Sequence, residues 1–212
     1  MELIINFLLR WAHVLFGITW IGLLYYFNFI QTEYFKEAEP DAKADATKKL
    51  APRALWWFRW AAMGTFLTGA AIIGAMGSAV NGFLIVGAVA GTLMFLNVWL
   101  IIWPNQKIVI GLVGGDGAAA APKAGLASRT NTLLSGAMLL GMLGSKHGTL
   151  PGLIPVSSPD FAPTGLIIAL LVIAAVQVNA LVGKMGPMAS VSGVIHSNIV
   201  LTVLIWAILS FI

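Results

Sequence analysis

The chain has no cysteine among its 212 residues and very few charged side chains. The absence of cysteine excludes disulfide bonds, thiolate metal sites and covalently attached c-type haem. Charged residues make up only 9% of the chain, whereas a soluble domain has about 25%. A composition this poor in charge indicates a membrane protein.

Acidic residues are particularly scarce, and five of the eight lie between residues 31 and 53. None lies in the middle of an apolar stretch, which argues against a carboxylate-bridged metal centre inside the membrane. The sequence also contains no flavin or nicotinamide motif. The net charge of +4 comes from the loops, so we expect no nucleic-acid partner.

Hydrophobic residues, at 59% of the chain, form long stretches. A helix of about 20 residues crosses about 30 Å of hydrocarbon, and six stretches of the chain are long enough or nearly so. Because they leave no room for a soluble domain, residues 1–212 are predicted to form one integral membrane domain, an all-α polytopic bundle. The predicted spans are 5–29, 54–76, 82–103, 129–147, 164–184 and 190–212.

The basic residues predict how these spans are oriented. Lysine and arginine gather in the segments after the first, third and fifth spans. Because cytoplasmic loops carry the excess of basic residues, these three loops are expected inside and both termini outside.

Three connections between the spans have distinct compositions. Residues 31–53 alternate acids and bases and are predicted to form a cytoplasmic interfacial helix interrupted at Pro40. Residues 111–127 are mostly small and are expected to form a flexible cytoplasmic linker. Residues 148–163 contain four prolines and are expected to form an irregular outer loop.

Three histidines are candidate ligands for a cofactor. At about 1.5 Å of rise per residue, His13 lies about 12 Å below the outer face and His196 about 9 Å above the inner face. His147 ends the fourth span near the outer interface. Two of the three could bind the iron of a b-type haem through imidazole nitrogens. The pair His13 and His196 matches best in depth, and the pair His13 and His147 is the rival.

Gly17 and Trp20 share a helix face with His13. This face could line one side of a porphyrin site, because a small residue beside a histidine leaves room for a flat macrocycle. It could equally pack against another helix. In the alternative interpretation, His13 only makes a hydrogen bond to a neighbouring helix, and His147 is a solvated helix end.

A second group of polar residues gathers on the cytoplasmic side, in the segments RALWWFRW, NVWLIIWPNQK and SRTN. Arginines and tryptophans at an interface often only contact lipid. The functional alternative is a substrate pocket for an anion, built from guanidinium, ammonium and amide groups. Its candidate residues are Arg53, Arg59, Asn97, Lys107, Arg129 and Asn131.

The segments HVLFGITWIGLLYYFNF, RALWWFRWAAMGTFLTG, VWLIIWPNQKIVIG and ASRTNTLLS occur in this order over residues 7–140. Together they resemble the membrane domain of the bacterial membrane-bound urate oxidases, the urate hydroxylase family. The resemblance implies a bacterial inner-membrane oxidoreductase that holds an anionic purine from the cytoplasmic side. A more distant resemblance, through HVLFGITWIG, is to the HemJ-type protoporphyrinogen oxidases, small haem-containing bundles with a histidine in the first helix.

In the urate oxidase family a c-type cytochrome domain usually follows the membrane part. No CxxCH motif occurs in this chain, so the resemblance implies a separate cytochrome as electron acceptor. The alternative is a non-catalytic subunit of a larger respiratory or oxidase complex. Both alternatives place the chain in the lipid bilayer, and either is compatible with a homo-oligomer.

Overall fold

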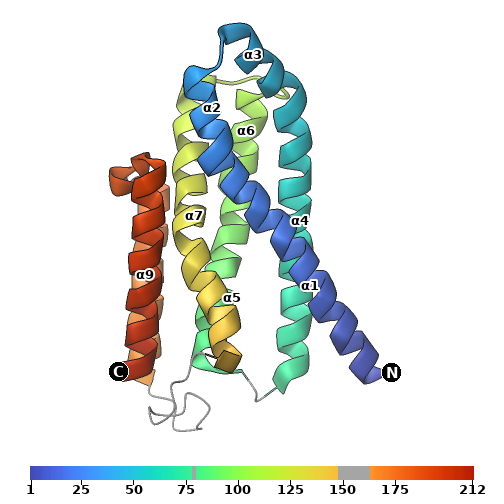
Figure 1. Cartoon of the computed structure of the whole chain (residues 1–212), viewed down its shortest axis with the longest axis vertical. Coiled ribbons are helices and arrows are strands. Elements are labelled where there is room, and N and C mark those ends of the chain that lie inside the picture. Colours follow the sequence, from blue (N-terminus) through green and yellow to red (C-terminus); the bar gives the residue numbers. More distant parts are fainter. Residues whose placement is uncertain (78–79, 148–162) are drawn as a thin grey trace. The chain divides into compact units, whose positions relative to one another are not determined.

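The structure, a computed structural model, describes residues 1–77, 80–147 and 163–212. Within these ranges every regular element is a helix, which confirms the all-α class, and the helices form six segments (Figure 1). The first three segments contain α1 (Glu2–Tyr25), η1 (Tyr26–Gln31) and α2 (Thr32–Glu37); α3 (Pro40–Asp45), η2 (Ala46–Leu50) and α4 (Ala51–Met76); and α5 (Gly82–Leu96), η4 (Asn97–Ile102) and α6 (Trp103–Val109). The others are α7 (Gly117–His147), α8 (Pro163–Val182) and α9 (Val191–Phe211), with the short turn η5 (Gly186–Ala189) before α9.

Four of these segments are long and apolar enough to cross a membrane: Glu2–Glu37, Gly82–Val109, Thr164–Val182 and Val191–Phe211. They support the assignment as a membrane protein. The helices α4 and α7 have 26 and 31 residues, which exceeds the length of about 20 residues that a span needs. They are less apolar than the other four, and their crossing of the membrane stays a prediction.

The connection expected as a flexible linker at 111–127 differs in the structure. Helix α7 already begins at Gly117, so only the first part of that range is non-helical. Two causes are visible: four consecutive alanines favour the helix, and the Asp116 carboxylate accepts hydrogen bonds from the backbone N–H of Ala118 (2.9 Å) and Ala119 (3.2 Å). Residues 117–127 are therefore part of a helix rather than an irregular linker.

The other two connections can be compared with the sequence only in part. Within residues 31–53 the helix breaks after Glu37 and restarts at Pro40, as expected where proline supplies the first helical residue. The outer loop expected at 148–163 lies outside the described residues, apart from Pro163, where α8 begins.

The chain divides into two compact units, which we describe separately. Unit 1 contains residues 1–72 and 95–131, and unit 2 contains residues 73–94 and 132–212. Most of the buried polar side chains lie in unit 1: Asn28, Thr65, Asn97, Arg129, Thr130 and Asn131. Such groups are costly at membrane depth and normally have a partner or a function, so unit 1 is the candidate location of a functional site.

Unit 2 is held together by small residues and one amide. Helices α5 and α7 approach each other at Gly87 and Gly141, where a Cβ atom on either glycine would meet backbone atoms of the other. Helix α9 is joined to α7 by Asn198, whose side-chain amide donates to the backbone oxygen of Thr132 (2.6 Å). Close backbone approach and interhelical hydrogen bonds of this kind are what stabilise helix pairs in lipid.

The predicted orientation can be tested by cysteine labelling, because the native chain has no cysteine. Ser78, the obvious outer position, lies outside the described residues, so we choose the exposed Glu2 near the N-terminus and the exposed Ala121. A Glu2→Cys variant should react with an impermeant maleimide on intact cells. An Ala121→Cys variant should react only after permeabilisation, and the reverse pattern would contradict the orientation derived from basic residues.

Candidate functional site

The half-buried His13 on α1 is oriented by a hydrogen-bond chain to α4. Its Nδ1 lies 3.0 Å from the Thr68 hydroxyl oxygen, and that hydroxyl donates to the backbone oxygen of Gly64 (2.6 Å). Because the one hydroxyl proton is directed to the carbonyl, Thr68 accepts from Nδ1–H of His13. The lone pair of the neutral imidazole is then on Nε2, the arrangement that metal-ligating histidines use.

Two glycines define the space around this imidazole. A Cβ atom at Gly69 of α4 would lie 3.0 Å from Cε1 of His13, so the ring rests directly on the glycine. One turn along α1, a Cβ atom at Gly17 would meet nothing within 4 Å. The ring is therefore packed on one side, while open space lies beside it at Gly17.

Two turns along the same face of α1, Trp20 is almost completely buried, with 1% of its surface exposed. Its indole Nε1 has no hydrogen-bond partner within the described part of the chain. A buried donor without an acceptor costs free energy, and a bound group with an acceptor atom would remove that cost. The predicted face of His13, Gly17 and Trp20 therefore combines an oriented imidazole, free space and an unused donor.

The other two histidines belong to unit 2. His196 is exposed on α9, and its Nδ1 lies 2.7 Å from the backbone oxygen of Ser192, which again leaves the lone pair on Nε2. His147 is exposed at the end of α7. Since His13 lies in unit 1, the pairing of His13 with either of them stays a prediction.

The second polar group of the sequence analysis is partly assembled around α7. Asn97 donates to the side-chain oxygen of Asn131 (2.8 Å), and Asn28 donates to the hydroxyl of Ser128 (2.8 Å). These two bonds join η1 and η4 to α7 within unit 1.

Two further candidates of this group share one aromatic ring. The Arg59 guanidinium lies 3.9 Å from the centre of the Trp103 ring, and the Lys107 ammonium lies 5.7 Å from the same centre. Both are cation–π distances. Arg53 is exposed at the beginning of α4. Of the predicted site residues, it has the weakest structural support.

The buried asparagines coincide with irregular helix geometry. Asn28 lies within the π-helical segment η1, and Asn97 begins the π-helical segment η4. Such segments are rare and frequently occur at functional sites. Sequence reasoning missed Asn28 and Thr68, and a polar residue in an otherwise apolar run was the available signal for both. Ser128 belongs to the segment SRTN but was not among the candidate residues.

Comparisons of the chain with family models, curated proteins and solved structures find no match. Within the described ranges no three histidine or acidic side chains come together as metal ligands.

Proposed function

We propose that the chain is a membrane-embedded oxidoreductase or electron-transfer protein that binds haem b at His13. The observation that carries the proposal is the bond between Nδ1 of His13 and Thr68, backed by the carbonyl of Gly64. A hydrogen bond to the far nitrogen fixes the tautomer and orientation of a ligating histidine. Haem supplies one-electron chemistry that the side chains of a cysteine-free bundle lack.

The surroundings of His13 fit a flat macrocycle. Gly17 leaves open space beside the imidazole, and Trp20 offers an unpartnered N–H on the same face. His196 and His147 are the candidates for a second axial ligand. Their side chains are both exposed, and Nε2 of His196 is available as a ligand atom.

The resemblance to the membrane-bound urate oxidases extends the proposal to a substrate and a partner. The substrate is an anionic purine that approaches from the cytoplasmic side, where Arg59, Asn97, Arg129 and Asn131 lie in unit 1. The electrons pass to a separate c-type cytochrome in the bacterial inner membrane. These extensions depend on sequence resemblance, whereas the haem proposal also has the geometry of His13 in its favour.

The direct test is the reduced-minus-oxidised absorption spectrum of the purified protein, with a pyridine haemochrome assay. We expect a b-type signal close to one haem per chain. Protein made with ample haem supply that contains none would refute the proposal. The chain would then be better explained as a non-catalytic subunit, and co-purification of a partner in mild detergent would be the next measurement.

Space on the two sides of His13 gives a matched pair of variants. Gly69→Ala places a methyl group 3.0 Å from Cε1 of His13, so the ring must shift by a few tenths of an ångström, and we expect a reduced haem content. Gly17→Ala meets nothing within 4 Å and should leave the apoprotein as stable as the parent. A loss of haem in Gly17→Ala alone would instead show that the macrocycle covers Gly17, whereas unchanged haem in Gly69→Ala would contradict the ring position described above.

A further inference from the structure

Arg129 on α7 is a buried cation whose hydrogen bonding is incomplete. Only 5% of its surface is exposed, and its Nη1 has no hydrogen-bond partner in the part of the chain that the structure describes. A guanidinium group has five N–H donors in a planar fork and stays charged inside proteins. A buried charge without a compensating partner costs free energy. An acceptor that binds Nη1 of Arg129 would therefore stabilise the folded protein.

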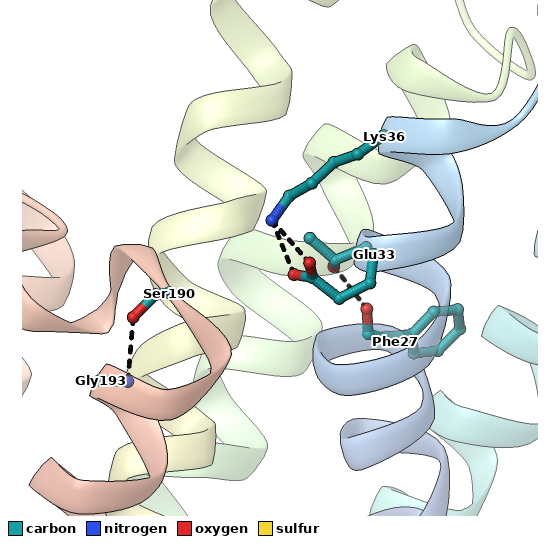
Figure 2. A network of polar contacts seen from close by, with 6 residues as sticks. Phe27, Glu33, Lys36, Ser190 and Gly193 are labelled. Atoms are coloured by element: carbon teal, nitrogen blue, oxygen red, sulfur yellow. Dashed lines mark hydrogen bonds and ion pairs between the residues drawn. The ribbon is translucent and has the colours of Figure 1, made fainter.

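Glu33, the acid whose charge acts on Arg129, does not supply this acceptor. Lys36 binds both of its carboxylate oxygens, at 2.7 and 2.8 Å (Figure 2). Among the described residues the ion pairs are Lys36–Glu33 and Lys49–Asp45. Arg129 therefore has no carboxylate of its own within this part of the chain.

Thr130, the residue after Arg129, is also a buried donor without a hydrogen-bond partner in the described part of the chain. Its side chain is fully buried. The flanking Ser128 and Asn131 are tied to Asn28 and Asn97 at 2.8 Å each. The backbone at Arg129 is thus fixed on both sides, while two consecutive buried side chains have donors without acceptors.

We propose that Arg129 is the anchor of a binding site for an oxyanion. The planar fork of arginine matches phosphate and carboxylate oxygens in a bidentate manner. Thr130, the next residue of α7, adds a second buried donor without a partner among the described residues. The oxyanion comes either from a soluble anion or from the phosphate of an anionic phospholipid. The other three arginines of unit 1 differ, because Arg59 already faces the Trp103 ring, and Arg10 and Arg53 are exposed. The proposal does not depend on haem at His13.

The test is thermal unfolding of the detergent-purified, delipidated protein. One arm titrates sodium phosphate against sodium chloride at equal ionic strength, and the other adds dioleoylphosphatidylglycerol against dioleoylphosphatidylcholine. We expect a saturable rise in Tm in at least one arm. Arg129→Gln should weaken that response roughly 30-fold or more, as removal of a buried charge partner does. Arg10→Gln, at an exposed arginine of unit 1 outside the candidate pocket, should leave it unchanged.

The outcomes separate the two sources and can overturn the proposal. A response to phosphate indicates a soluble anion, and a response to phosphatidylglycerol alone indicates a lipid headgroup. If Arg129→Gln does not fold, Arg129→Lys keeps the charge without the fork and should show a weaker response than the parent. No response of the parent in either arm, or an equal response in the Arg129 and Arg10 variants, would refute the site.

Discussion

A His13→Ala variant is expected to lose the b-type Soret band of the purified protein. Alanine removes the nitrogen that would bind the iron, and in hydrocarbon no water is available as a replacement ligand. The packing cost should be modest, because His13 is only half-buried. The measurement is the haem-to-protein ratio of monodisperse protein after size-exclusion chromatography. A full Soret band in this variant would show that His13 is not a haem ligand. His196 and His147 would then be the remaining candidate ligands.

A second variant distinguishes ligation from simple packing. Thr68→Val keeps the shape of the side chain but removes the hydroxyl that accepts from His13 Nδ1. Loss of such an orienting bond typically lowers metal affinity about 10–100-fold, so haem content should fall without vanishing. Thr19→Val is the matched control, since that hydroxyl bonds only the backbone oxygen of Leu15 on its own helix (3.1 Å). Equal haem content in both threonine variants would indicate that Thr68 has no role in ligation.

Sequence reasoning could predict the helical segments because hydrophobicity is a local property. The predicted span over 82–103 coincides with α5 and η4, and that over 190–212 coincides with α9. The importance of His13 also followed from a local fact, a titratable group in an apolar run. The helical start of α7 at Gly117 was missed because small residues favour flexible linkers and helices alike, and the deciding feature was the cap at Asp116.

The site itself depends on contacts between helices, which the sequence does not reveal. Nothing in the local sequence of α4 indicates that Thr68 accepts from His13 or that Gly69 supports its ring. The partners Asn28 and Ser128 are 100 residues apart in the chain. For Arg129, the sequence showed its type and depth, but the lack of a carboxylate partner could be seen only once the acids were placed.

The approach of α5 and α7 in unit 2 predicts a large effect on stability. Replacing Gly141 with alanine would bring a methyl group into contact with the backbone of Gly87 and within 2.6 Å of the backbone oxygen of Phe83. Backbone atoms cannot turn aside as a flexible side chain does, so the helices must separate. Overpacking of this kind costs about 1–3 kcal/mol, and we expect Tm to fall by about 5–10 °C.

The matched control is Gly91→Ala, also at the contact of α5 with α7. Its Cβ atom would lie 3.6 Å from the side chain of Met138, an ordinary contact, and the higher helix propensity of alanine favours the variant by about 1 kcal/mol. Gly91→Ala should therefore unfold at or slightly above the temperature of the parent in detergent. Because both substitutions add the same methyl group, a difference between them isolates the backbone contact. Equal unfolding temperatures for the two would mean that α5 and α7 do not depend on Gly141 for their approach.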